Sequence, residues 1–251
     1  MKQKLTFIFV LFFFSLSVFA QKDTINVPGY YETGTYGTLN DAVETARTDG
    51  TINNTVFKLS LYEVYVLSRS IFMSFGENLE IVAPKSGTTF DTAPPQIVWT
   101  EEEIEKTYLI QTYGDVTLKN LWIRYDDFSG IQRQTGIVFE DSAAVQGDDV
   151  ETGYFEGCIF DYSQIGSESG GSITVKADHF VGVFKDCYFR NLSDFHFQYY
   201  GRAVSFPFQS SGFHYDNLLF ENCTFSNLSR IVMQEGNEYG DNIHINIISN
   251  K

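Results

Sequence analysis

A short pattern of apolar and polar residues recurs through the middle of the chain and predicts its architecture. Each strong copy begins with a large apolar residue, continues with two polar or small residues, and then alternates. About 30 to 40 residues separate the starts of the strong copies, and repeats of this length, rich in aromatic and β-branched residues, are typical of solenoids built from strands. The strong copies are Leu118–Ile123, Phe155–Phe160, Phe184–Phe189 and Phe220–Phe225, and the weaker ones are Gly76–Ile81 and Gly240–Ile245.

The third position of each copy predicts a sharp bend in the backbone. It holds only Asn, Asp or Gly, the residue types that adopt a positive φ at least cost. A left-handed residue repeated once per copy indicates a corner between two short strands. Beyond it, we expect the fourth and sixth positions to face the interior and the fifth to face outwards. The predicted corner residues are Asn78, Asn120, Gly157, Asp186, Asn222 and Asn242.

These repeats predict an all-β protein, a right-handed parallel β-helix in which inward residues form columns along the axis. The right-handed path follows from the crossover rule for parallel strands. A β-sandwich is the competing architecture, but it needs hairpin turns at short spacing. Asn-Gly or Asp-Gly turns between alternating runs are nearly absent, so we favour the β-helix.

The two ends of the predicted solenoid differ. Apolar residues recur at helical spacing over Thr38–Thr48, and Gly50 follows as a stop signal. A helix there would cover the first rung, which otherwise exposes a sheet edge. At the other end, Ile243–Lys251 has the pattern of a strand within a rung, with no cap after it. We therefore expect the domain to be C-terminally incomplete or to need a partner at this end.

Residues 1–20 are predicted to be a cleaved signal peptide. Lys2 and Lys4 precede the apolar run Leu5–Leu16, and Val18–Ala20 resembles a signal peptidase site. The run is too short to span a bilayer comfortably, and no other stretch is apolar enough to do so. We therefore expect residues 21–251 to form a single β-helix domain without a membrane span, secreted or displayed at the cell surface.

Composition and charge exclude some partners. The 251 residues include 32 Asp and Glu against 17 Lys and Arg, which gives a formal net charge of −15. A chain this acidic does not attract the phosphates of nucleic acid or an anionic membrane surface. Hydrophobic residues make up 43 % of the chain, so it can form a folded core.

The cysteines and histidines are interpreted as structural. Cys158, Cys187 and Cys223 occupy the same inward position of three successive repeats, so we expect a column of free, buried thiols. The odd number allows at most one disulfide, and no metal-ligand spacing surrounds them. The histidines are scattered in sequence beside apolar or aromatic residues, and we assign none to a metal or catalytic site: His179, His196, His214 and His244.

The outward positions give the candidate binding residues. The register predicts that Trp122 and Tyr188 share a face with a column formed by Arg124, Asp161 and Arg190. Aromatic rings stack on pyranose rings, and arginines make forked contacts with carboxylates, so this face suits an acidic polysaccharide. An arginine beside a carboxylate also fits β-elimination, which needs a base and a cation on the uronate carboxylate. The alternative interpretation is a surface ladder of ion pairs, which adds little stability.

The N-terminal third carries a resemblance to a known family. Its capping helix, strand, tyrosine-containing segment and first rung resemble the opening of secreted bacterial proteins of the pectate-lyase-like parallel β-helix superfamily. The resemblance implies the fold; the superfamily includes lyases, hydrolases, epimerases and adhesins, so it implies no single activity. It rests on Gly37–Ala46, Thr55–Leu59, Tyr62–Leu67 and Asn78–Val82, together with the rungs that follow.

Known motifs of that superfamily are incomplete here. Gly147–Asp149 matches the Gly-Asp-Asp element of polygalacturonase-like hydrolases, but the rest of their signature is missing, so we interpret it as a loop. The arginine motif of pectate lyases is also absent. The acidic clusters Asp126–Asp127 and Asp148–Glu151 could hold Ca²⁺, although neither has an ordered ligand spacing.

Two functions of different class follow from the sequence. The first is the binding or processing of an extracellular, acidic polysaccharide along the outward face; if catalytic, the protein would be a polysaccharide lyase before a glycoside hydrolase. The second is a structural or adhesive surface solenoid without chemistry. The catalytic residues stay unassigned, and Ca²⁺ is the only cofactor considered.

Overall fold

The computed structural model describes most of the chain after the predicted signal peptide, which itself lies outside the described residues. Within the described part, no helix is long and apolar enough to cross a membrane. Gly147–Asp149, His196 and Asn242 also lie outside it. The described residues are 22–87, 89–100, 108–127, 136–140, 150–162, 171–177, 179–192, 201–207, 214–234 and 244–248.

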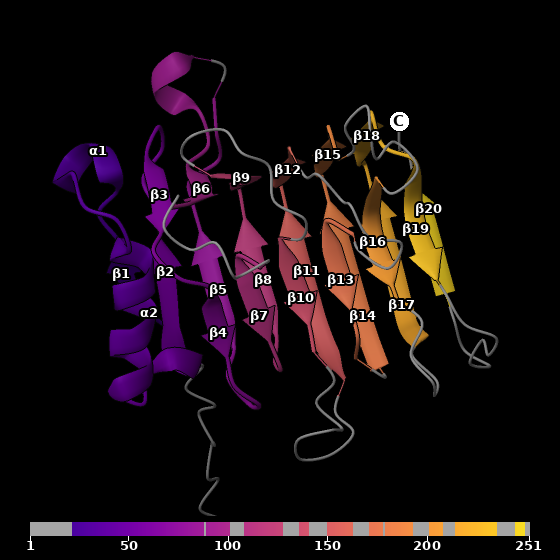
Figure 1. Ribbon diagram of the computed structural model, residues 1–251, viewed down its shortest axis with the longest axis horizontal. Helices are drawn as coiled ribbons and strands as arrows, with labels where there is room; N and C mark the ends of the chain where they lie inside the picture. Colours follow the sequence, from indigo (N-terminus) through magenta and orange to yellow (C-terminus); the bar gives the residue numbers. More distant parts are fainter. Residues whose placement is uncertain are drawn as a thin grey trace, which may run out of the picture.

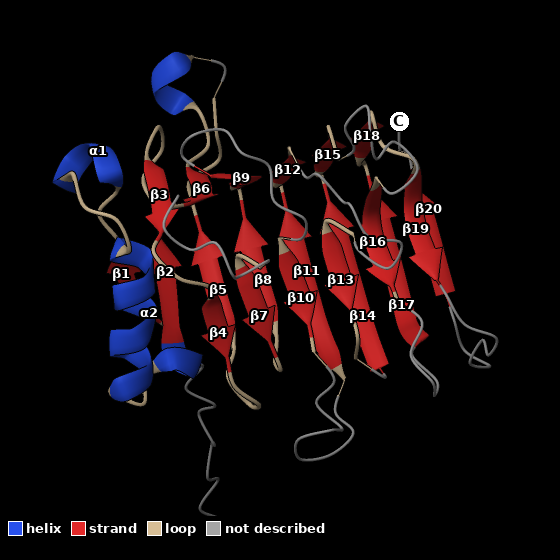
Figure 2. Ribbon diagram, viewed as in Figure 1, coloured by secondary structure: helices blue, strands red, loops and turns tan. Residues whose placement is uncertain are grey.

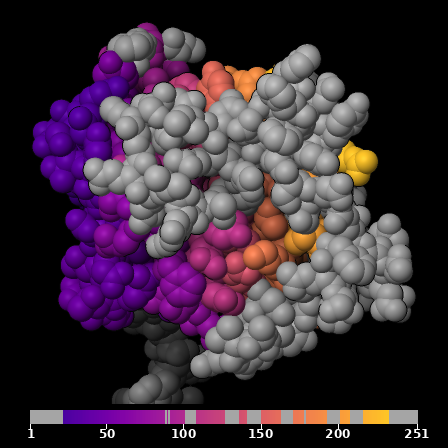
Figure 3. Space-filling view, viewed as in Figure 1, coloured from indigo at the N-terminus to yellow at the C-terminus, as the bar shows by residue number. Residues whose placement is uncertain are grey.

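The protein is a parallel β-helix, as the repeats predict. The chain visits three sheets in turn, and every strand pairs in parallel with strands three places away in the sequence, apart from the first pair, β1 with β2. The rungs therefore follow one another in sequence order along the molecule, from indigo to yellow (Figures 1 and 3).

We name the sheets A, B and C. Sheet A contains β1 (Asp23–Asn26), β2 (Thr55–Lys58), β5 (Leu79–Val82), β8 (Val116–Lys119), β11 (Glu151–Glu156), β14 (His179–Lys185), β17 (His214–Glu221) and β20 (His244–Ile248). Sheet B contains β3 (Val64–Leu67), β6 (Gln96–Trp99), β9 (Trp122–Asp127), β12 (Ile159–Asp161), β15 (Tyr188–Arg190) and β18 (Thr224–Ser226). Sheet C contains β4 (Ile71–Met73), β7 (Ile110–Thr112), β10 (Ile137–Phe139), β13 (Ile173–Val175), β16 (Arg202–Phe206) and β19 (Arg230–Gln234).

The corner between sheets A and B has the predicted left-handed residue in each strong repeat. Asn120, Gly157, Asp186 and Asn222 have φ values of 58°, 63°, 53° and 54°. The corner side chains also connect rungs: Asn222 Nδ2 donates to Asp186 Oδ1, and Asn120 Nδ2 donates to the Ala83 carbonyl at 2.8 Å. Asn and Asp at the corner thus have two roles: they adopt the positive φ of the bend, and their side chains form hydrogen bonds between neighbouring rungs.

The two weak repeats were placed in the wrong register. β5 pairs with β8 and β20 pairs with β17, so both strands belong to sheet A rather than to sheet B. Before β5, the left-handed residue is Gly76 with φ 76°, and Asn78 is not left-handed. The cause at β5 is that Gly76, which has a positive φ, precedes an alternating strand of sheet A and so produces a similar sequence.

A second left-handed corner, which the sequence pattern did not reveal, follows sheet B. Tyr162, Asn191 and Asn227 directly follow β12, β15 and β18, and their φ values are 59°, 53° and 55°. Asn227 Nδ2 donates to Asn191 Oδ1 at 3.2 Å, so amide side chains link neighbouring rungs here as well. Each of these rungs therefore has a fixed bend at both ends of its sheet B strand.

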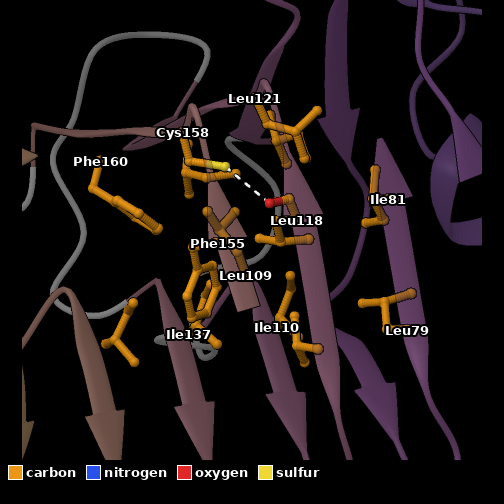
Figure 4. Packing of buried hydrophobic residues seen from close by; sticks show 14 of the residues in the cluster. Leu79, Ile81, Leu109, Ile110, Leu118, Leu121, Ile137, Phe155, Cys158 and Phe160 are labelled. Atoms are coloured by element: carbon orange, nitrogen blue, oxygen red, sulfur yellow. Dashed lines mark hydrogen bonds between the residues drawn. The ribbon is translucent and has the colours of Figure 1, made fainter. Parts of the chain in front are cut away.

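The core consists of columns of apolar side chains, and in the later rungs two of these columns are stacks of phenylalanine rings. Phe155, Phe184 and Phe220 stack with ring centroids 5.1 and 4.7 Å apart and nearly parallel planes. Phe160 and Phe189 begin a second stacked column, with centroids 4.7 Å apart. Figure 4 shows how Phe155, Phe160 and Cys158 pack with the leucines and isoleucines of earlier rungs.

The predicted column of free thiols is confirmed. Cys158, Cys187 and Cys223 are buried and form no disulfide. Each thiol donates to a carbonyl of the preceding rung: Cys158 to Leu118 at 3.3 Å, as drawn in Figure 4, and the other two at 3.5 and 3.4 Å. Burial raises the pKa of Cys187 well above its usual value, so this thiol stays protonated and unreactive.

The predicted cap is also confirmed, with the predicted bounds. Helix α2 (Thr38–Thr48) stands at the N-terminal end of the solenoid beside β2 and β3, and it buries Leu39, Val43 and Ala46 (Figure 2). The Asn40 side chain secures it, because its amide donates to the Arg69 carbonyl at 2.7 Å and accepts from the Ser68 N–H at 2.9 Å. Shorter helical segments are α1 (Tyr30–Thr33), η1 (Ile52–Asn54) and η2 (Phe90–Thr92).

We expect Phe184→Ala to destabilise the protein by about 3–5 kcal/mol, because it removes the central ring of a buried stack and leaves a cavity. The matched control is Phe72→Ala, which truncates a ring that is 42 % exposed and should change stability by about 1 kcal/mol or less. Urea unfolding followed by circular dichroism measures both. Equal losses for the two variants would contradict the importance of the stack.

Candidate binding face on sheet B

The outer face of sheet B brings the predicted side chains into the predicted columns. Ile159 of β12 pairs with Trp122 of β9 on one side and with Tyr188 of β15 on the other. Two positions further along, Asp161 pairs in the same way with Arg124 and Arg190. The register inferred from the strong repeats is therefore correct across these three rungs.

Asp161 is the buried centre of this face. Its side chain is fully buried although it lies on the outer side of the sheet, because its neighbours cover it. Arg190 Nε donates to Oδ2 at 2.7 Å, Trp122 Nε1 donates to the same oxygen at 3.2 Å, and Asn191 Nδ2 donates to Oδ1 at 2.9 Å. The sequence predicts that Asp161 faces outwards beside the arginines, and the structure adds that these neighbours cover it, so Asp161 positions the side chains around it.

The ring of Trp122 is close to both arginines. The guanidinium carbons of Arg124 and Arg190 are 5.5 and 5.3 Å from the centroid of its ring, and Arg124 is also 5.6 Å from the ring of Tyr162. At these distances, the negative faces of the aromatic rings attract the cations. The aromatic and charged side chains consequently form one continuous set of contacts on the outer face of sheet B.

The hydrogen-bonding groups of Arg124 are already occupied. Its Nη1 donates to Gln96 Oε1 at 2.7 Å, its Nε donates to Asp126 Oδ1 at 3.0 Å, and its Nη2 pairs with Asp126 Oδ2. Burial raises the pKa of Asp126, and the contacts with Arg124 oppose that shift. Asp126 was one of the residues suggested for Ca²⁺, but in the structure it serves as the partner of Arg124.

Arg190 and Tyr188 are open to solvent on this face, as is Tyr162 beside Arg124. The Arg190 side chain is 38 % exposed and uses Nε for Asp161. Among the residues that the structure describes, no hydrogen-bond partner contacts either of its Nη groups. Tyr188 is 50 % exposed and lies one strand position before Phe189, whose ring is in the core. A guanidinium fixed by a buried carboxylate thus stands beside an exposed aromatic ring.

Helix α1 extends the aromatic surface toward the N-terminus. Tyr30 packs against Val64, Val66 and Val98, which lie on the outer side of β3 and β6. Around it are three exposed tyrosines with neighbouring rings 5.3 to 6.3 Å apart. The sequence pattern did not predict this cluster, because no repeat covers α1. Its exposed members are Tyr31, Tyr36 and Tyr62.

A separate hollow lies at the corner between sheets C and A. It has a volume of about 290 Å³ and is lined by two carboxylates, Asp115 and Glu151, together with Asn78 and Tyr113. Asp115 Oδ1 accepts from the Thr152 N–H at 2.8 Å. Among the side chains that the structure describes, no three His, Cys, Asp or Glu residues are arranged to hold a metal ion. Asp148 and Asp149 of the suggested Ca²⁺ cluster lie outside these residues.

Comparison with known proteins assigns the chain to no family. No protein-family model matches the chain, and no curated protein matches it significantly. Functional inference therefore depends on the surfaces just described.

We expect Asp161→Asn to destabilise the protein by about 2 kcal/mol, because the new amide N–H₂ would face donors that now share a carboxylate. Asp41→Asn is the matched control: Asp41 forms an exposed ion pair with Arg69 at 3.4 Å, and its loss should cost about 0.5 kcal/mol or less. Thermal and urea unfolding compare the two. A neutral effect of Asp161→Asn would mean that the hydrogen bonds at this carboxylate contribute little.

Proposed function

We propose that the protein binds an extracellular acidic polysaccharide along the outer face of sheet B. The observation that carries the proposal is the exposed pair Tyr188 and Arg190, in which Arg190 is fixed by Asp161 and by the ring of Trp122. Such an arrangement provides a flat apolar surface for a pyranose ring next to a directed cation for its carboxylate. A side chain fixed before binding also loses less conformational entropy on contact with the ligand.

The repeat of the solenoid supports a polymeric ligand. Neighbouring strands of sheet B are about 4.8 Å apart, close to the length of one sugar residue in an extended chain. The exposed tyrosines around α1 lie at the other end of the same face, beyond Val98 and Gln96. A chain laid along the axis would therefore meet the rings of Tyr188 and Trp122 on alternate rungs, with Ile159 between them, and then the tyrosines around α1.

Binding is favoured over elimination by the described side chains. A lyase needs a proton acceptor beside the cation that neutralises the uronate carboxylate. Arg190 can serve as that cation, but Asp161, the nearest carboxylate, is buried and accepts three hydrogen bonds. We therefore propose a carbohydrate-binding member of the pectate-lyase-like superfamily that is exported by its N-terminal signal.

A structural or adhesive solenoid is the second candidate. The observation that favours it is charge balance, because each arginine of this face has its own carboxylate, Asp126 for Arg124 and Asp161 for Arg190. Such pairs also occur on surfaces that only need to cover a sheet. The two candidates differ in whether the exposed groups have a measurable affinity for a glycan.

We expect Tyr188→Ala and Arg190→Gln each to weaken binding to uronate polymers at least tenfold, because one removes the stacking ring and the other the carboxylate contact. The controls are Tyr154→Ala and Lys119→Ala, which alter a similar cation–aromatic pair, 5.2 Å apart, on sheet A. Calorimetric titration with polygalacturonate and alginate oligomers measures affinity, and a neutral glucan tests the need for charge.

Two results would overturn the proposal. One is a well-folded protein without affinity for any glycan, which would leave the structural solenoid as the explanation. The other is an equal loss of affinity in the sheet A controls. Release of unsaturated uronate, seen by its ultraviolet absorbance, would instead establish a lyase and contradict the preference for binding alone.

A further inference from the structure

Two tyrosines adopt a backbone conformation that is normally left to Asn, Asp or Gly. Among the described residues with a positive φ, all the others are of those three types, whereas Tyr62 and Tyr162 have φ values of 64° and 59°. This conformation is sterically unfavourable for a bulky L-residue. Strain of this kind is concentrated at ligand-binding and catalytic sites. Both side chains are exposed, so packing in the core does not account for the choice of tyrosine.

Tyr62 belongs to a group of four tyrosines at the N-terminal cap, which we call the tyrosine cluster: Tyr30, Tyr31, Tyr36 and Tyr62. The Tyr62 N–H donates to the Ala93 carbonyl at 2.8 Å, which fixes its backbone just before β3. Its ring centroid is 5.7 Å from that of Tyr31. The ring of Tyr30 is in turn 6.3 Å from that of Tyr31 and 5.3 Å from that of Tyr36. The four rings therefore form one connected aromatic surface.

Helix α1 holds the most exposed of these rings in a fixed place. The Tyr31 side chain is 59 % exposed, and its backbone N–H donates to Glu63 Oε2 at 3.0 Å. The Glu63 carboxylate packs so closely on Gly29 that a Cβ at Gly29 would collide with it. At the end of α1, the Gly34 N–H donates to the Tyr30 carbonyl at 2.7 Å. Rings fixed before binding lose less conformational entropy when a ligand is bound.

Two carboxylates lie at the tyrosine cluster. Glu63 is the hydrogen-bond partner of Tyr31, and Glu32 is the next residue of α1. Burial raises the pKa of Tyr65, and Glu63 and Glu32 add to this shift, so both carboxylates act on this end of the solenoid. A uronate would be repelled here, whereas a carboxylate can accept hydrogen bonds from the hydroxyl groups of a neutral sugar. The end of the face that carries Arg190 has the opposite preference.

The tyrosine cluster and the arginines belong to one continuous face. Tyr30 packs on Val98 of β6, and Gln96 of the same strand accepts from Arg124 of β9 at 2.7 Å. The strand order β3, β6, β9, β12, β15 puts four spacings of about 4.8 Å between the tyrosine cluster and Arg190. A sugar chain of about four or five residues would therefore reach from one to the other.

We propose that the tyrosine cluster is a subsite for uncharged sugar residues, and that the ligand of this face is a heteropolysaccharide containing both neutral sugars and uronates. The inference rests on the proposed function and narrows its substrate class. Aromatic rings stack on pyranose rings without any need for charge, and phenolic hydroxyl groups both donate and accept hydrogen bonds. Tyrosine at position 62, in place of a residue that suits a positive φ, is explained by the contact that its ring makes with the ligand.

The test is calorimetric titration of the purified protein with short neutral gluco-, manno-, galacto- and xylo-oligosaccharides. We expect saturable binding of at least one of them, unchanged by added salt because no charge is recognised. Tyr31→Ala and Tyr62→Asn should each weaken it by about fivefold or more, since each removes a stacking ring. Tyr62→Asn should not lower the melting temperature, because Asn adopts a positive φ at less cost than Tyr. Loss of binding in that variant is then separate from loss of the fold.

Phe72→Ala is the matched control, because it removes another exposed ring, on sheet C, that contacts a neighbouring aromatic, Tyr113, at 5.9 Å. It should leave the affinity unchanged. The inference is overturned if no neutral oligosaccharide binds saturably, or if Phe72→Ala weakens binding as much as Tyr31→Ala does. Binding of uronate oligomers alone would retain the proposed function and contradict the neutral subsite, whereas binding of neutral oligomers alone would do the reverse.

A mixed ligand is tested with hyaluronan oligomers, in which glucuronate alternates with an uncharged N-acetylated sugar. They should bind more tightly than polygalacturonate oligomers of equal length, because one chain then supplies both kinds of contact at once. Tyr31→Ala should abolish this difference. Equal affinity for the two oligomers would contradict the mixed ligand.

Discussion

The left-handed corner residue is the constraint on which the rest of the structure depends. Asn120, Gly157, Asp186 and Asn222 each turn the chain from sheet A to sheet B at the same point of the rung. Because the backbone hydrogen bonds run between rungs, a corner in a fixed place sets the register of all the residues around it. The phenylalanine stacks and the thiol column inside the solenoid are direct consequences of that register.

The same register imposes a problem on the outer surface. Residues at equivalent positions of neighbouring rungs lie only about 4.8 Å apart, so like charges in a column would repel each other. On sheet B the charges alternate instead: Asp161 lies between Arg124 and Arg190. The rings of Trp122 and Tyr162 pack beside the arginines and reduce their contact with water. The buried carboxylate of Asp161 thus separates two like charges that the register would otherwise bring into one column.

The sequence predicts the periodic parts of this structure well and the non-periodic parts poorly. Residues in the strong repeats, such as Trp122, Tyr188 and Arg190, could be aligned because the corner defines a common origin. The burial of Asp161 could not be predicted, since it depends on donors from the two neighbouring rungs, among them Asn191 at the second corner. The weak repeat around β5 was misaligned because Gly76 and Asn120, which both have a positive φ, precede similar alternating strands that belong to different sheets.

The contrast between the two outer faces shows what a single inserted residue can do to such a solenoid. On sheet B the pairing is regular, and each carboxylate meets an arginine that is always charged. On sheet A the bulge at Asp216 interrupts the register and gives that carboxylate a histidine as its partner, with side chains that are about one third exposed. Regular stacking therefore aligns Asp161 with two arginines on sheet B, whereas the inserted residue on sheet A places the Asp216 carboxylate beside His179, a partner that the repeat pattern does not predict.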